Sequence, residues 1–238
     1  MRARSLYPLP LLCVLLLAAC ASEPSRPAPD AVAADTVSAA PGEAPAPERR
    51  TILFLGNSLT AGLGLDPEQA FPALIRHRID SLGWRFEVVN AGLSGETTAG
   101  GLRRIDWLLR RPVDVLVLAL GGNDGLRGIP PEVTKANLQD IIDKARARYP
   151  DVRIILAGMQ APPNLGEAFT EPFRSLFPEV ARERDVALIP FLLEDVGGVP
   201  ERNQADGIHP TAEGHRIIAE TVWRTLRPIL EAMNETAE

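Results

Sequence analysis

Short apolar runs alternate with longer stretches of mixed polarity along most of the chain after residue 50. Each short run has the length of a buried strand, and the five runs lie at 51–55, 86–90, 113–120, 152–158 and 186–190. In the longer stretches apolar residues recur every three or four positions, as on one helix face, at 66–83, 97–110, 130–149, 168–184 and 211–230. This alternation predicts an α/β fold, a three-layer α/β/α sandwich around a five-stranded parallel sheet.

The residues that directly follow each predicted strand are the most informative, because ligands of parallel sheets bind beyond the carboxyl ends of the strands. These segments are rich in glycine and polar residues, and they lie at 56–58, 90–95, 121–124, 159–163 and 206–210. In the first of them, Ser58 comes two residues after Gly56. This pattern fits a nucleophile at the sheet edge, but it also fits a tight turn that needs small residues.

A serine nucleophile needs a base that accepts its proton and a third group that orients the base. His209 lies in a loop before the last predicted helix, with Asp206 three residues earlier, a spacing that lets the carboxylate fix the imidazole tautomer. The alternatives are a turn or capping role for His209 and a helix N-terminal role for Asp206. Of the other histidines, His77 lies among charged residues of a helix and is expected to be solvated, whereas His215, inside the last helix, could equally be a surface residue.

Acyl transfer also requires hydrogen-bond donors for a developing oxyanion. Gly95 can offer an unobstructed backbone N–H, and Asn123 can offer its side-chain amide. Their alternatives are ordinary turn chemistry for Gly95 and a local side-chain hydrogen bond for Asn123. Ser94, the other serine that follows a predicted strand, fits a backbone loop.

Four residues in this order, Ser58, Gly95, Asn123 and His209, resemble the name-giving residues of the SGNH (GDSL) hydrolase superfamily. The segments GNSLTAGLG, GGNDGLRGI and DGIHP are similar to its bacterial thioesterase I, protease I, lysophospholipase L1 and arylesterase branch. The resemblance extends from residue 51 to about residue 230, and it implies a flavodoxin-like version of the predicted fold.

The resemblance implies that Ser58 attacks an ester or thioester carbonyl, that His209 is general base and then general acid, and that Asp206 orients His209. The backbone N–H groups of Ser58 and Gly95, with the Asn123 side chain, would form the oxyanion hole. The implied partner is a small acyl ester substrate, with no metal and no organic cofactor.

Two neighbours of Ser58 depart from familiar patterns. The family's usual aspartate before the serine is Asn57 here, which removes a charge but leaves an oxygen that accepts a hydrogen bond. Thr60 stands where the last glycine of a Gly-x-Ser-x-Gly motif would be, which separates this chain from the α/β-hydrolase elbow.

The first fifty residues have a different composition. Residues 1–19 combine early arginines with a short apolar stretch and predict a lipoprotein signal peptide in which Cys20 is lipidated. The alternative is an ordinary cleaved signal in which Cys20 is incidental. Residues 20–50 are rich in alanine and proline and predict a disordered tether. The hydrolase domain is then expected at 51–232, followed by a tail at 233–238.

The net charge and the positions of the cysteines exclude some classes of function. A formal net charge of −6 argues against nucleic acid. The two cysteines, Cys13 and Cys20, both precede the predicted domain, which therefore has no disulfide, cysteine nucleophile or thiolate zinc site. Ala21, rather than an aspartate, after Cys20 favours transfer to the outer membrane, so the predicted product is an exported bacterial lipoprotein with a membrane anchor.

The sequence thus predicts a serine esterase that acts on acyl, aryl or lysophospholipid esters and on thioesters. A carbohydrate O-deacetylase and a non-catalytic surface lipoprotein are the alternatives. Four apolar residues after the third and fourth strands are candidates for an acyl groove or for ordinary packing: Leu126, Ile129, Leu165 and Phe169.

Overall fold

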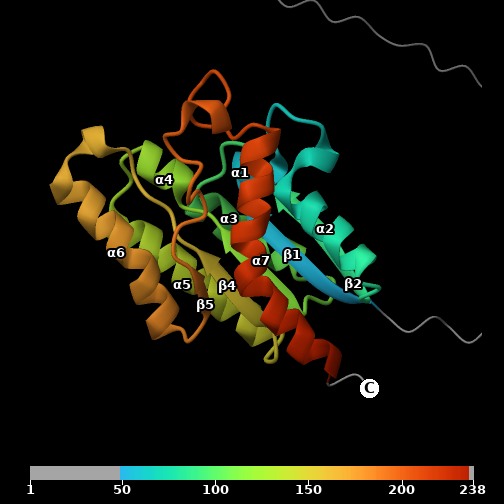
Figure 1. Cartoon of the computed structure of the whole chain (residues 1–238). Helices are drawn as coiled ribbons and strands as arrows, with labels where there is room; N and C mark the ends of the chain where they lie inside the picture. The colour runs from blue at the N-terminus through green and yellow to red at the C-terminus, as the bar shows by residue number, and fades with distance from the viewer. Residues whose placement is uncertain (1–48, 236–238) are drawn as a thin grey trace, which may run out of the picture. The chain divides into compact units, whose positions relative to one another are not determined.

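Five parallel strands form one sheet in the computed structural model of the chain, which describes residues 49–235 (Figure 1). The strands are β1 (Arg50–Gly56), β2 (Phe86–Gly92), β3 (Val115–Ala119), β4 (Arg153–Ala157) and β5 (Ala187–Ile189). Their order in the sheet is β2-β1-β3-β4-β5. In this order the chain reverses its direction of winding between β1 and β3, the place where doubly wound sheets bind ligands.

The longer helices form the two outer layers. They are α2 (Phe71–Ser81), α3 (Thr98–Leu108), α5 (Pro131–Arg148), α6 (Glu167–Glu183) and α7 (Ala212–Glu235). Helices α2 and α7 pack together on one face, and α5 packs between α3 and α6 on the other (Figure 1). All five residues of β3 are buried because both helical layers cover this central strand. The predicted three-layer sandwich is therefore confirmed.

The shortest elements differ from the sequence prediction. Helices α1 (Ser58–Ala61) and α4 (Gly122–Leu126) follow β1 and β3 directly, and four or five residues are too few to show a helical period. The helix expected at 66–83 is divided into the 3₁₀ turn η1 (Pro67–Gln69) and α2, whose first turn contains Pro72.

The ends of the folded part also extend further than expected. Strand β1 begins at Arg50 rather than at residue 51, and α7 continues to Glu235 rather than ending at residue 230, so it passes the expected domain end at 232. The Arg50 guanidinium donates a hydrogen bond to the Met233 carbonyl, which ties the last turn of α7 to the start of the sheet. Helix α6 runs unbroken through Pro172 and Pro178, close to the predicted bounds of 168–184. Within the described residues no helix is long and apolar enough to cross a membrane.

Candidate active site

Ser58 lies at the point where β1 ends and the short helix α1 begins. The Asn57 side chain accepts a hydrogen bond from the Leu59 N–H at 3.0 Å and so caps α1, a role that its amide oxygen fills without a charge. Gly92, at the end of β2, allows α1 to lie against the sheet edge, since a Cβ there would come within 2.3 Å of the Ala61 nitrogen. Ser58 is 7% exposed and is held at the carboxyl edge of the sheet.

The structure brings Ser58, His209 and Asp206 together in one hydrogen-bonded series. The Nε2 atom of His209 lies 2.9 Å from the Ser58 Oγ, and its Nδ1 lies 2.6 Å from the Asp206 Oδ2. An ionised carboxylate only accepts, so Nδ1 carries the proton and Nε2 accepts from the serine hydroxyl. The imidazole is therefore in the tautomer that a general base requires.

Asp206 is fixed by its own local turn. Its Oδ1 accepts hydrogen bonds from the N–H groups of Ile208, at 2.9 Å, and His209, at 3.0 Å. The bond from the His209 ring, followed by these two backbone bonds, holds the pKa of the Asp206 carboxyl well below its usual range. The carboxylate is consequently ionised at neutral pH and keeps the imidazole oriented.

Gln204 ties the loop of His209 to the loop that follows Ser58. Its side-chain amide donates to the carbonyls of Leu63, at 2.7 Å, and Pro210, at 3.0 Å, and its N–H donates to the His209 carbonyl at 2.7 Å. Sequence analysis did not single out Gln204. Its role depends on two loops that are far apart along the chain, so no local motif could indicate it.

Besides Ser58, the oxyanion candidates are Gly95, on the loop after β2, and Asn123, in the short helix α4 after β3. Gly95 has a φ of +80°, a conformation that favours glycine. In the described part of the chain, neither the Gly95 nor the Ser58 backbone N–H has an acceptor. The Asn123 amide donates one hydrogen to the Glu96 carbonyl at 2.9 Å, which orients the side chain and leaves its second hydrogen for another acceptor.

An ion pair with a buried carboxylate supports the Gly95 loop. The Arg104 Nε lies 2.7 and 2.8 Å from the two carboxylate oxygens of Glu96, whose side chain is 3% exposed. The same guanidinium donates to the Ala91 carbonyl at 2.6 Å, at the end of β2. From the other side, Arg127 donates to the Gly95 carbonyl at 2.9 Å. Sequence analysis missed these three charged residues, since Arg104 and Arg127 bind backbone that only the fold brings near and Glu96 acts through Arg104.

A cavity of about 350 Å³ opens beside Ser58, Asn123 and His209. Its wall is largely apolar and includes Leu126, Met159, Ala161, Phe191, Leu193 and Ile208. Of the four predicted groove residues, only Leu126 lines it; Ile129, Leu165 and Phe169 do not.

The remaining candidates lie outside this site. Ser94 is exposed on its loop, as expected. His77 is solvated and pairs with Glu68 at 2.8 Å, which confirms the sequence prediction. His215 is 1% exposed, so the alternative that it is a surface residue is wrong.

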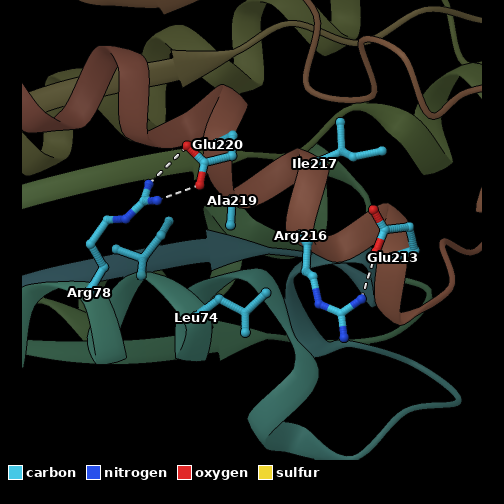
Figure 2. A pocket seen from close by; sticks show the side chains of 8 residues that line it. Leu74, Arg78, Glu213, Arg216, Ile217, Ala219 and Glu220 are labelled. Carbon is cyan, nitrogen blue, oxygen red and sulfur yellow. Dashed lines mark hydrogen bonds and ion pairs between the residues drawn. The ribbon is translucent and has the colours of Figure 1, made fainter.

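A second cavity, of about 360 Å³, lies between α2 and α7 (Figure 2). Two ion pairs flank it, Arg78 with Glu220 and Arg216 with Glu213. None of its lining residues belongs to the series that contains Ser58.

A doubly wound parallel sheet that carries a hydroxyl, an imidazole and a carboxylate in hydrogen-bonded series, beside free backbone donors, defines the class of serine hydrolases. Within that class, the chain belongs to the GDSL-like Lipase/Acylhydrolase family, whose model matches residues 54–217.

The chain is similar to Esterase TesA of Pseudomonas aeruginosa, with 44% identity over 76% of this chain and 90% of the relative. It is 38% identical to Thioesterase 1/protease 1/lysophospholipase L1 of Escherichia coli, over 76% of this chain and 85% of the relative. Among solved structures, the SGNH-hydrolase family esterase AlinE4 is 39% identical, with a TM-score of 0.63 over 78% of this chain and 97% of that one. The family and the branch predicted from the motifs are confirmed.

Proposed function

We propose that the chain is a serine esterase that hydrolyses carboxylic esters through an acyl-enzyme. The observation that carries the proposal is the unbroken series from the Ser58 Oγ through His209 to Asp206, with contacts of 2.9 and 2.6 Å. In the first step the Ser58 oxygen attacks the ester carbonyl while its proton passes to the His209 Nε2. His209 then gives this proton to the leaving alcohol as the ester C–O bond breaks.

Deacylation reverses these roles with water. His209 takes a proton from the attacking water, and the tetrahedral intermediate collapses to release the carboxylic acid while Ser58 regains its proton. In both steps negative charge develops on the carbonyl oxygen. The free N–H groups of Ser58 and Gly95 and the second amide hydrogen of Asn123 are the donors proposed to stabilise it.

The proposed substrates are acyl, aryl and lysophospholipid esters, and acyl thioesters. Support comes from the apolar wall of the cavity beside Ser58 and from the names of the relatives, which are an esterase and a thioesterase with lysophospholipase activity. The apolar wall disfavours the alternative substrate, an acetylated carbohydrate, and the complete hydrogen-bonded series disfavours a non-catalytic role.

A fluorophosphonate probe tests the nucleophile. We expect the wild-type chain to be labelled and Ser58→Ala to be unlabelled, with kcat lowered by about 10³-fold or more. Ser94→Ala, at an exposed serine of a neighbouring loop, is the matched control and should keep full labelling. Full labelling of Ser58→Ala would remove Ser58 from the mechanism. A panel of aryl esters beside acetylated sugars then separates the acyl hydrolase from the deacetylase.

We further propose that the chain is an exported lipoprotein held to a membrane through Cys20. The support is sequence alone, since residues 1–48 lie outside the described part: arginines at positions 2 and 4, an apolar stretch, and Leu17-Ala18-Ala19 before the cysteine. Cys20→Ser should move the protein from the membrane fraction to the soluble fraction, whereas Cys13→Ser should leave it in the membrane. Retention of Cys20→Ser in the membrane would contradict the anchor.

A further inference from the structure

Large apolar side chains that remain exposed gather at one edge of the sheet. The described residues include eight of them, each at least 38% exposed. Two lie toward the amino edge, Leu82 after α2 and Trp107 near the end of α3. The other six, which we call the apolar rim, lie at the carboxyl edge with the active site: Leu63, Leu93, Leu126, Val133, Leu165 and Ile208.

Each connection that follows a strand contributes one residue to the apolar rim. Leu63 comes after β1, Leu93 after β2, Leu126 after β3, Leu165 after β4 and Ile208 after β5. Val133 belongs to the first turn of α5, which starts at the same edge because it returns antiparallel to the strands. Five separate connections therefore contribute an exposed apolar residue to one end of the domain, a concentration that is typical of an interaction surface.

Hydrogen bonds and cavity-lining residues place five of the six residues of the apolar rim near the mouth of the active-site cavity. Leu126 and Ile208 line the cavity itself, and Leu165 follows Pro163, which also lines it. The Leu63 carbonyl accepts the hydrogen bond from Gln204, in the loop of His209. The Leu93 N–H donates to the Gly56 carbonyl at 3.0 Å, two residues before Ser58.

We propose that the apolar rim docks the enzyme onto aggregates of amphiphilic lipid with uncharged or zwitterionic headgroups, from which the substrate passes directly into the cavity. This inference rests on the proposed esterase function. Whatever covers the apolar rim also covers the cavity mouth. A protein partner or a second copy would block the substrate there, whereas a lipid aggregate supplies it.

The net charge of the molecule disfavours lipids with anionic headgroups. A formal net charge of −6 gives no general attraction to anionic headgroups, so docking depends on apolar area removed from water. A few partly inserted leucine and isoleucine side chains give reversible binding rather than permanent anchoring. Such binding lets the cavity mouth engage and leave a lipid surface repeatedly.

The experiment uses the full chain with Cys20→Ser, which removes the proposed acyl attachment. Hydrolysis of lysophosphatidylcholine is followed below and above its critical micelle concentration, beside a short, monomeric aryl ester, and binding is measured by flotation with phosphatidylcholine vesicles. We expect flotation with the vesicles and a rise in rate of about tenfold on crossing the critical concentration.

Substitutions at the apolar rim should separate docking from chemistry. Leu63 and Leu165 do not line the cavity, so the double variant Leu63→Gln/Leu165→Gln should lose about fivefold or more in the micellar rate and in vesicle binding. Its rate on the monomeric ester should stay within about twofold of the parent. The matched control, Leu82→Gln/Trp107→Gln at the amino edge, should leave both rates and the flotation unchanged.

Three results would overturn the docking proposal: no flotation with no rise above the critical concentration, equal losses in the control variant, or a concentration-dependent dimer in sedimentation that the rim variant abolishes. Failure of the esterase function would look different. The parent would then hydrolyse neither ester, while the flotation assay would still decide whether the apolar rim binds lipid.

Discussion

Glu96 is the residue next to the oxyanion candidate Gly95, and its carboxylate is buried against Arg104. A buried charge that loses its partner is costly, typically about 3–5 kcal/mol. The exposed pair between Arg78 and Glu220, beside the second cavity (Figure 2), has side chains that are 38% and 59% exposed and is worth about 1 kcal/mol or less. The two pairs use the same residue types, so they separate a positioning role from a general effect of removing an ion pair.

Glu96→Gln should lower kcat by about 10- to 100-fold with KM changed by less than about threefold, because a shifted Gly95 N–H weakens stabilisation of the transition state more than substrate binding. Steady-state kinetics, normalised by active-site titration with a phosphonate, measures kcat per folded molecule. Glu220→Gln is the control and should keep kcat within about twofold. An equal loss in both variants, or a loss confined to KM, would contradict the positioning role.

The catalytic and oxyanion candidates could be predicted from the sequence, and the residues that position them could not. Asp206 and His209 are three residues apart, so their pairing depends on one turn and can be predicted from the sequence. Ser58, Gly95 and Asn123 could be placed at one edge because each follows a strand. Arg104, Arg127 and Gln204 act across loops, where sequence spacing carries no distance information.

At the scale of elements, α2 receives its cap from another helix. Ala70, before α2, has no side chain that caps it, and the Phe71 N–H instead donates to the Nδ1 of His215 in α7 at 3.1 Å. The imidazole also stacks on the Phe71 ring, with centroids 6.2 Å apart. Burial, with a smaller contribution from His209, lowers the pKa of His215 from 6.5 to about 4. His215 is therefore neutral in the folded state at neutral pH.

The free energy of unfolding should fall as the pH drops from about 6.5 toward 4, since the unfolded chain binds a proton at His215 that the folded chain excludes. Above pH 6.5 His215 is neutral in both states and does not change the free energy of unfolding. Below this pH the free energy of unfolding falls, by about 3 kcal/mol or less in all. Urea unfolding at several pH values measures how the free energy of unfolding depends on pH. The comparison is between the wild type and His215→Asn, whose amide oxygen replaces Nδ1 as acceptor and which should lose this dependence. His77→Asn, at an exposed histidine, should retain it. A wild-type slope in His215→Asn would mean that other groups cause it.

Element prediction succeeded where periodicity was long enough. The five long helices repeat their apolar pattern several times and the five strands lie in short apolar runs, whereas α1 and α4 are one turn long and are defined by caps and by the end of the preceding strand. Asn57 and Gly62 specify α1, but the same residues are common in plain turns. The burial of His215 was also not predictable, because it depends on α2 and α7 packing together.

At the scale of the whole molecule, strand order assembles the site. Ser58 follows β1, which lies between β2 and β3, the strands that precede Gly95 and Asn123. His209 arrives from the edge strand β5 through a loop of some twenty residues. The alternation of strands and helices in the sequence predicts a parallel sheet, but it leaves the strand order open. The family resemblance, carried by four separated residues, implies a flavodoxin-like fold, and the structure shows the strand order.

The fold and the site are both contained in the described residues. Buried apolar residues run from Ile52 to Leu230, and the last turn of α7 is bound to β1 through Arg50 and Met233. A chain that begins at Ala46 should therefore keep its melting temperature within about 2 °C and its rate on monomeric esters within about twofold.

A further truncation after Arg227 removes the fully buried Leu230 and the Arg50 contact. It should lower the free energy of unfolding by about 2–5 kcal/mol, or the melting temperature by roughly 5–15 °C. Truncation after Glu235 is the matched control and should change neither quantity. Thermal unfolding by circular dichroism measures all three, and a large loss on removing residues 1–45 would show that the domain depends on them.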